Sequence, residues 1–221
     1  AARADTILIP NLHKALFVTS HFKMTPRLII IMGLFSFLFG CKGNTKKTVT
    51  ETFQVDGDTI TTKSTETDGG LDANYKLADL TPELKSHISD KLKEAELLII
   101  KYNGQLPPSK YDANILDLVF DNWRQSKDTK KEAPEYVVEA LGAAFGQDIV
   151  NSLDCNWQML TDQYGSDITV IHIKYKVNGF PFSSAEKAYT ENKIGSFQGI
   201  KLTMKHHIQE AEKSGNVQDR Q

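Results

Sequence analysis

The spacing of apolar residues changes along this chain, and that change constrains its fold more than any other feature of the sequence. Between Thr81 and Leu153, apolar residues recur every three or four positions, which is the period of amphipathic helices. From residue 156 to residue 182 they alternate or form short runs, as in strands. We therefore expect one α+β domain with three N-terminal helices, a three-stranded antiparallel sheet and C-terminal helices.

Each of the three N-terminal helices has a recognisable start. Thr81 is a suitable N-cap with Pro82 at the first helical position, and Asp112 can cap the second helix. Pro134 begins the third helix, whose wide apolar face predicts a place at the centre of the core. That face consists of Val137, Val138, Leu141, Ala144, Phe145, Ile149, Val150 and Leu153.

The expected strands cover residues 156–162, 167–173 and 177–182. The first two form an antiparallel pair around a turn at 163–166, where Gly165 can adopt a positive φ. A short helix from Ser184 and a last helix, with an apolar stripe beginning at Phe197, complete the domain.

The first two strands are expected to be apolar on both faces. With Asp162 opposite Asp167, Trp157 and Met159 share one face with His172, and leucine and isoleucine side chains occupy the other. This pattern leaves two interpretations open. The pair is covered on both sides, or one face is kept for a partner.

Residues 24–40 have the arrangement of a bacterial lipoprotein signal peptide. Met24 and Arg27 precede an apolar run of 12 residues at 28–39. This length fits the apolar core of a signal peptide, which has roughly 7–15 residues, and falls short of the ~18 apolar residues of a membrane-spanning helix. The tetrad Leu38-Phe39-Gly40-Cys41 resembles the lipobox of bacterial lipoproteins, which implies cleavage before Cys41 and acylation of that residue. Phe39 departs from the small residue often found there, and the alternative is a buried apolar helix with an incidental cysteine.

The signal predicts the organisation of the remaining chain. Residues 1–23 are expected to be a non-native or mis-started extension, and 77–215 to be the folded domain, followed by a tail at 216–221. Residues 41–76 are polar and threonine-rich, as in a tether. Within this tether a hairpin could place Phe53 opposite Ile60, and both an ordered hairpin and a disordered tether are consistent with the sequence.

Charge and cysteine content narrow the range of partners. Residues 1–40 contain four of the 26 basic and one of the 28 acidic residues, so the chain from Cys41 onward carries about −5 instead of −2. No basic stripe stands out, and we expect no nucleic-acid partner. Cys155 has no partner for a disulfide once Cys41 is acylated, and it is expected to be a packed, inert thiol rather than a nucleophile.

Part of the domain resembles a bacterial domain family of unknown function. The matching residues are Leu141-Gly142-Ala143-Ala144-Phe145-Gly146, Trp157, Thr161-Asp162-Gln163-Tyr164-Gly165 and Phe180-Pro181-Phe182-Ser183-Ser184. The resemblance covers roughly residues 116–197. It implies a fold unit and a bacterial source, and it transfers no catalytic residues.

Two patterns could indicate catalysis. Ser184 and Lys187 form an S-x-x-K sequence, in which a lysine one turn away can activate a serine. Ser183 and Glu186 also form a capping box, which would explain the serines without catalysis. His172 could be a general base, although a hydrogen-bonded core histidine is the alternative.

Metal and phosphate sites are not expected. His206 and Glu210 lie one helical turn apart but lack a third ligand, and Asp154, Asp162 and Asp167 do not form a calcium-binding loop. Gly142 and Gly146 share a helix face and are expected to allow close packing of another element, because no strand leads into them as in a phosphate loop. We expect neither a metal nor a cofactor.

These observations lead to two functional hypotheses. The first is a lipid-anchored, non-enzymatic binding module on the periplasmic side of the bacterial envelope, joined to the membrane through Cys41. It would bind a protein or envelope component through Trp157, Tyr164 and His172, and an immunity-type protein is a special case. The alternative is a small envelope hydrolase that uses Ser184 and Lys187, or His172.

Overall fold

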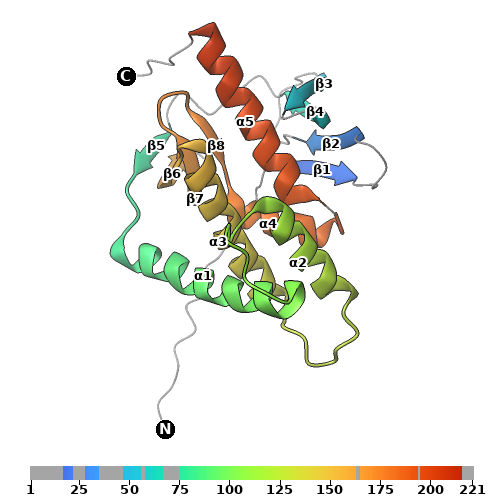
Figure 1. Cartoon of the computed structure of the whole chain (residues 1–221). Coiled ribbons are helices and arrows are strands. Elements are labelled where there is room, and N and C mark those ends of the chain that lie inside the picture. The colour runs from blue at the N-terminus through green and yellow to red at the C-terminus, as the bar shows by residue number, and fades with distance from the viewer. Residues whose placement is uncertain are drawn as a thin grey trace.

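Five helices and two four-stranded sheets form the part of the chain that the structure describes (Figure 1). This computed structural model describes residues 17–21, 28–34, 47–55, 58–66, 75–162, 165–193 and 195–215. The expected α+β class is confirmed. The sheet that contains residues 156–179 has four strands instead of the predicted three.

The three N-terminal helices begin where the sequence predicts. Helix α1 (Pro82–Asn103) is capped by Thr81, whose Oγ1 accepts from the backbone N–H of Leu84 at 3.3 Å. Asp112 caps α2 (Ala113–Gln125) by accepting from the backbone N–H of Asn114 at 3.0 Å. Helix α3 (Pro134–Leu153) begins with a proline, whose fixed φ suits the first helical turn.

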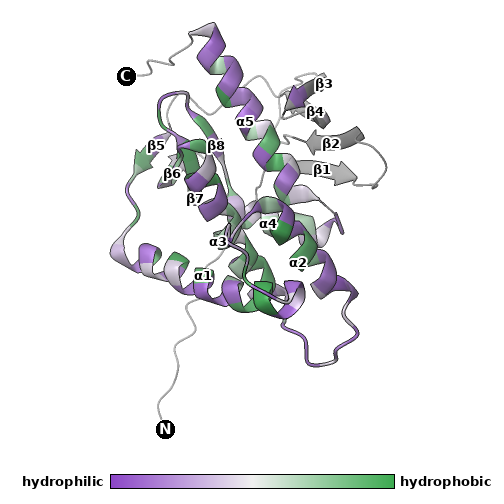
Figure 2. Ribbon diagram, viewed as in Figure 1, coloured by the Kyte–Doolittle hydropathy of each residue, from purple (hydrophilic) through white to green (hydrophobic). Residues whose placement is uncertain are grey.

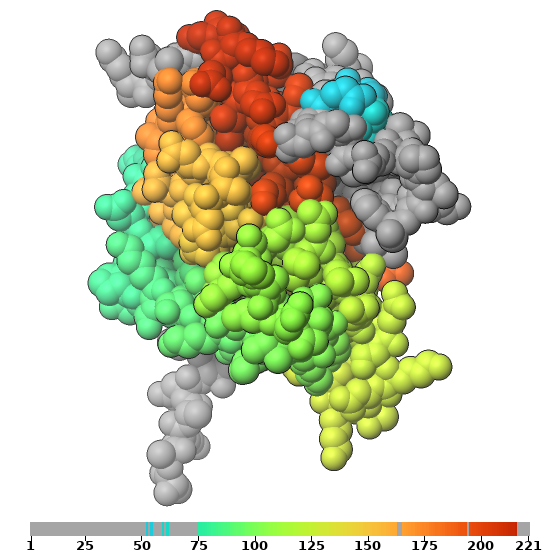
Figure 3. All heavy atoms as spheres, viewed as in Figure 1, coloured from blue at the N-terminus to red at the C-terminus, as the bar shows by residue number. Residues whose placement is uncertain are grey.

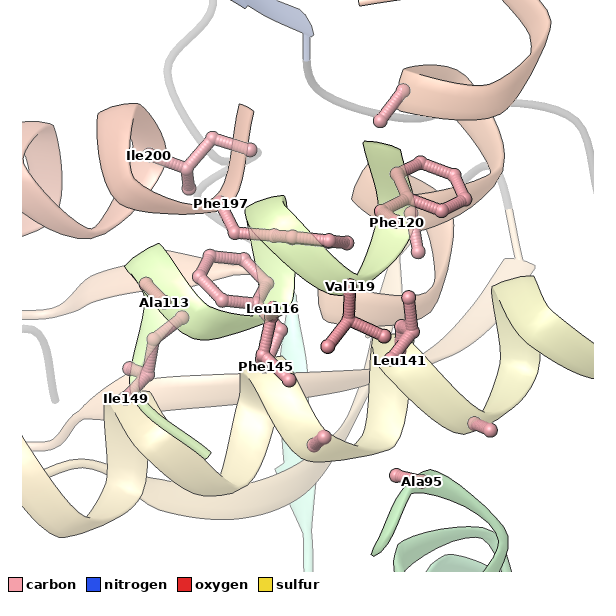
Figure 4. Close-up of a cluster of buried hydrophobic side chains, with 14 of the residues drawn as sticks. Ala95, Ala113, Leu116, Val119, Phe120, Leu141, Phe145, Ile149, Phe197 and Ile200 are labelled. Atoms are coloured by element: carbon pink, nitrogen blue, oxygen red, sulfur yellow. The ribbon is translucent and has the colours of Figure 1, made fainter. Parts of the chain in front are cut away.

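Helix α3 lies at the centre of the core, as its wide apolar face predicts. The Phe145 and Phe197 rings lie 4.9 Å apart between their centroids and are tilted by 44°. Figure 4 shows buried side chains of α2, α3 and the last helix, α5 (Ser196–Ser214), meeting around these rings. In Figure 2 the hydrophobic residues of α2 and α3 gather where these helices face each other.

The well-packed sheet contains β5 (Lys76–Ala78), β6 (Asn156–Asp162), β7 (Gly165–His172) and β8 (Val177–Gly179), paired antiparallel in that order. Strand β5 was not predicted. It pairs Leu77 with Leu160. Three residues are too few to show the alternation from which strands are predicted.

The predicted register of β6 and β7 is wrong by two residues. Asp162 pairs with Gly165 and Leu160 with Asp167, because only two residues separate the strands. Gly165 has a φ of 132°, which favours glycine. A shift of two residues keeps every side chain on its own face, so Trp157 still shares a face with His172.

Helix α4 (Pro181–Thr190) begins three residues before the predicted start at Ser184, and β8 ends at Gly179 instead of residue 182. Pro181 occupies the first turn, a position that proline favours. Ser183 therefore lies inside the helix. The predicted capping box of Ser183 with Glu186 is wrong.

Two glycines on α3 allow other elements to approach its backbone. A Cβ at Gly142 would lie 3.0 Å from the Phe182 Cα, and a Cβ at Gly146 would overlap the ring of Trp157. Trp157 belongs to β6 and Phe182 to α4, so this face of α3 contacts both elements. The predicted packing role of the two glycines is confirmed.

Substitution of Gly146 by alanine tests this contact. We expect Gly146→Ala to lower the free energy of unfolding by about 1–3 kcal/mol, because the added methyl forces Trp157 to move. Denaturant unfolding followed by tryptophan fluorescence measures the change. The matched variant Gly142→Ala should lose less, since its new contact is longer. A Gly146→Ala protein as stable as the wild type would contradict the close approach.

The second sheet has the order β1-β2-β4-β3 and lies beside α5 in Figure 1. Its strands are β1 (Phe17–His21), β2 (Leu28–Leu34), β3 (Lys47–Val55) and β4 (Asp58–Glu66). Strands β3 and β4 are antiparallel and pair Phe53 with Ile60, which is the pairing expected for the hairpin.

The sequence predicts no strand at β1 and β2, because the pattern of residues 1–40 indicates an extension and a signal peptide. Strand β2 runs antiparallel to β1 and parallel to β4. Three consecutive isoleucines in β2 suit a strand, since β-branched residues favour extended backbone. Cys41 and the rest of the lipobox lie outside the described residues.

Candidate functional site

Trp157, the first of the expected binding residues, is half-buried between α3 and α4. Its Nε1–H donates to Oε1 of Gln147 over a long 3.4 Å, and its ring centroid lies 6.1 Å from that of Phe182. The ring also covers Gly146. These contacts make Trp157 part of the packing. Tyr164, the second expected residue, lies outside the described residues.

His172, the third expected residue, is buried at the end of β7. Its Nδ1 accepts from the backbone N–H of Tyr175 at 3.2 Å, and its ring stacks on that of Tyr175 with centroids 4.8 Å apart. Among the described residues, no serine, cysteine or carboxylate is hydrogen-bonded to this ring. The contacts are those of a hydrogen-bonded core histidine.

Ser184 and Lys187 lie on the buried side of α4, with 4% and 6% of their surfaces exposed. The Ser184 hydroxyl donates to the carbonyl oxygen of Phe180 at 2.8 Å. Burial lowers the pKa of Lys187 to about 7, and the charge of Lys193 adds to this shift. A lysine with this pKa could accept a proton near neutral pH, but the serine hydroxyl is engaged with the backbone of its own helix.

The acidic residues near the hairpin serve separate structural roles. Asp167 accepts from the Ser183 hydroxyl at 3.2 Å and from the backbone N–H of Ile168 at 2.7 Å, and burial raises its pKa. Asp154 ends α3 with a φ of 51°. Within residues 75–162, 165–193 and 195–215, no three His, Cys, Asp or Glu side chains are placed to hold a metal ion.

Glu210, His206 and Cys155, the remaining candidate residues, also contact neighbouring residues of the fold. Glu210 forms a 2.9 Å ion pair with Lys213, one turn further along α5, and the His206 ring lies next to that of His207. Cys155 is buried, and burial raises the pKa of its thiol to about 12. This thiol is packed as expected, and its raised pKa disfavours the reactive thiolate.

A group of charged residues that sequence reasoning missed lies where α2 meets α4 and α5. The Asp117 carboxylate accepts from the backbone N–H groups of Phe197 and Gln198, at 3.1 and 3.0 Å, in the first turn of α5. The Arg124 guanidinium donates to the carbonyl oxygens of Ala188 and Lys193 at the end of α4. We call Asp117, Arg124 and the four residues that they bind (Ala188, Lys193, Phe197 and Gln198) the α2 clamp.

The signs of these charges suit the helix ends that they contact. A carboxylate is favoured at a helix N-terminus and a cation at a C-terminus, because each complements the partial charge of unpaired backbone groups. Asp117 and Arg124 are seven residues apart, so they lie on the same side of α2, two turns from each other. The sequence shows this spacing, but it does not show which helix ends the two side chains contact.

Burial shifts the pKa of several groups in and near the clamp. It raises the pKa of Asp117 to about 7, although the two backbone N–H groups act in the opposite direction. It lowers the pKa of Lys193 to about 8 and also lowers the pKa of Arg124, which lies 3.8 Å from Asp121. Shifted pKa values occur at functional sites and in structural ion pairs alike. Here Asp117 and Arg124 join α2 to the ends of α4 and α5, so we interpret these shifts as structural.

Comparisons with known proteins identify no family. No protein-family model matches the chain, and no curated protein matches it. One crystal structure, of a protein from Bacteroides thetaiotaomicron VPI-5482, is similar over 69% of each chain, with 11% sequence identity and a TM-score of 0.45. A likeness of this size decides neither fold nor function. The resemblance of residues 116–197 to a domain family stays a prediction.

The pKa of Asp117 predicts how stability depends on pH. A carboxyl whose pKa is near 7 in the folded protein and ~3.9 in the unfolded chain binds its proton more tightly when folded. The contribution of Asp117 to the free energy of unfolding therefore increases as the pH falls from 7 to 4. We expect the difference in unfolding free energy between wild type and Asp117→Asn to grow in favour of the wild type over that range.

Urea unfolding of both proteins at a series of pH values measures this difference, and subtraction removes contributions from carboxyl groups that the two proteins share. Asp79→Asn is the matched control, because Asp79 is exposed and accepts a hydrogen bond from the Gln158 side chain. A difference that is constant with pH would show that Asp117 titrates normally in the folded protein.

Proposed function

We propose that this protein is a lipid-anchored component of the bacterial envelope that acts as a non-enzymatic binding module on the periplasmic side of a membrane. The observation that carries the proposal is the order of Arg27, the apolar run 28–39, Gly40 and Cys41, followed by a polar, threonine-rich segment. Cleavage before Cys41 would remove β1 and β2 from the second sheet and leave the β3–β4 hairpin. Among the described residues, no helix has the length and apolar character needed to cross a bilayer. The lipid on Cys41 would supply the attachment.

The arrangement of the domain supports binding over catalysis. The Ser184 hydroxyl is hydrogen-bonded within α4, and His172 accepts from the backbone of Tyr175. A partner, either a protein or another envelope component, would therefore bind a surface. The net charge of about −5 from Cys41 onward is compatible with an immunity-type protein that neutralises a cationic toxin.

Replacement of Cys41 tests the anchor. In cells given labelled fatty acid, the wild-type protein should take up the label and remain with the membrane fraction. Cys41→Ala should lose both properties, because acylation needs the thiol. Cys155→Ala should keep both, since that thiol is buried in the domain. An unlabelled wild-type protein in the soluble fraction would overturn the lipid anchor.

A small envelope hydrolase is the second candidate, and the lowered pKa of Lys187 is the observation that favours it. Lysine with a pKa of about 7 is partly uncharged at neutral pH, as a general base must be. In this case Lys187 would take the proton of the Ser184 hydroxyl as its oxygen attacks the acyl carbonyl carbon. Lys187 would return that proton to the departing group, and water would then hydrolyse the acyl-serine ester.

Activity-based labelling with an acylating serine-hydrolase probe distinguishes the two candidates. The binding module predicts no Ser184-dependent label. A hydrolase predicts a label that Ser184→Ala abolishes and that increases with pH around 7 as Lys187 loses its proton. Ser183→Ala is the matched control, because its hydroxyl donates to Asp167 instead. A label that depends on Ser184 would replace the binding module with the hydrolase.

A further inference from the structure

Strand β4 is an inner strand of the second sheet, with a neighbour on each side. In the order β1-β2-β4-β3, one neighbour is β3 and the other is β2, which runs parallel to β4. The register pairs residues 28–30 of β2 with residues 59–61 of β4. We call residues 1–40 the leader. Because β2 lies within the leader, cleavage before Cys41 would turn β4 into an edge strand.

The hairpin that remains after this cleavage has its own contacts. The hydroxyls of Thr52 and Thr61 lie 3.0 Å apart across the two strands, and the Gln54 side chain donates to the hydroxyl of Thr59. Strands β3 and β4 both contact α5. Figure 3 shows these four residues as a cyan patch on the surface, beside α5 in red. The edge of β4 would therefore lie on the surface of the domain.

The β4 edge has the properties of a strand acceptor. An edge strand presents backbone N–H and C=O groups that can pair with another strand, and charged residues or proline commonly block such pairing. Residues 59–61 are Thr-Ile-Thr, without a charge or a proline. A two-stranded hairpin is only marginally stable in water, and a third strand stabilises it. The loss of β2 thus leaves an edge that gains stability from a replacement strand.

Strand β2 shows which kind of segment this edge accepts. Its sequence, LIIIMGL, is apolar and contains three consecutive isoleucines, which favour extended backbone. When a strand adds to a sheet edge, main-chain hydrogen bonds supply much of the affinity, and they form with any segment that can extend along the edge. A segment that is extended, uncharged and rich in β-branched residues would fit the edge as β2 does.

We propose that cleavage opens the β4 edge as an acceptor for an extended apolar strand of a partner protein, and that the leader occupies this edge in the uncleaved chain. The proposal rests on the proposed function, because it requires removal of the leader. It deepens that function by giving the binding surface and the chemical class of the partner. Retention of the leader and binding of the partner exclude each other, so the protein binds only after processing.

A labelled peptide with the sequence of residues 28–34, flanked by lysines for solubility, tests the acceptor edge. The protein is the full chain with Cys41→Ala, which cannot be acylated, and with a site for a specific protease inserted after residue 44. Fluorescence anisotropy should show that the peptide binds the cut protein. The uncut protein should bind it more weakly by about tenfold or more, because its tethered leader competes at a high effective concentration.

Two control peptides test the strand geometry. An Ile30→Pro peptide lacks a backbone N–H and should bind more weakly by about tenfold or more. An Ile29→Cys peptide should form a disulfide with an Ile60→Cys protein, because the register pairs these residues. A Gly33→Cys peptide should not, since four residues of strand place its cysteine about 13 Å further along.

Near-UV circular dichroism of the cut protein shows whether the domain stays folded. If the folded, cut protein does not bind the peptide, or binds the proline peptide equally well, the acceptor edge is overturned. A dimer of the cut protein that excludes the peptide would overturn the partner protein in favour of a second copy. The assay needs neither the lipid nor processing in the cell, so fatty-acid labelling of the wild type tests the anchor separately.

Discussion

The close approach of two elements, β6 and α4, to one face of α3 is the constraint on which the rest of this domain depends. Helix α3 is buried along most of its length, and Gly142 and Gly146 are the positions where β6 and α4 meet its backbone. Trp157 of β6 fills the space above Gly146. The sheet can lie this close to α3 because Gly146 has no side chain. Close-packed interiors leave little room to absorb an added methyl group at such a contact.

An ion pair between buried Asp148 and half-buried Lys201 fixes the opposite side of the same helix. Lys201 of α5 donates to both carboxylate oxygens of Asp148, at 2.9 and 2.8 Å, and the backbone N–H of Ala113 donates to one of them at 3.1 Å. Asp148 thereby joins α3 to α5 and to the start of α2. Removal of one partner from a buried pair generally costs about 3–5 kcal/mol, because the other charge stays buried without compensation. Apolar packing and this pair together determine how α2 and α5 lie on α3.

The sequence predicts the helices well because their signals are local. Thr81, Asp112 and Pro134 each lie at a helix start, and the apolar spacing that follows identifies the buried face. The faces of β6 and β7 are also predictable, since alternation survives an error of two residues in register. Local signals fail at α4, where Pro181 begins the helix and Ser183 resembles a cap that the structure does not use.

The candidate site is less predictable, because its geometry depends on contacts between distant segments. Nothing around Asp117 shows that its carboxylate accepts hydrogen bonds from residues 80 and 81 positions later. Trp157 and His172 do share a face of the sheet, but their neighbours Gln147 and Tyr175 engage them in packing and backbone contacts. Sequence reasoning identified side chains with suitable chemistry, whereas the structure shows what each of them contacts.

The α2 clamp has a consequence for the order in which the domain is completed. Asp117 and Arg124 belong to a helix near the middle of the chain, yet their partners lie between residues 188 and 198, which are made near the end. Until that segment arrives, the two charges remain in water, and α2 cannot dock with both of them satisfied. Part of the core therefore stays open until the last helix, α5, has been made.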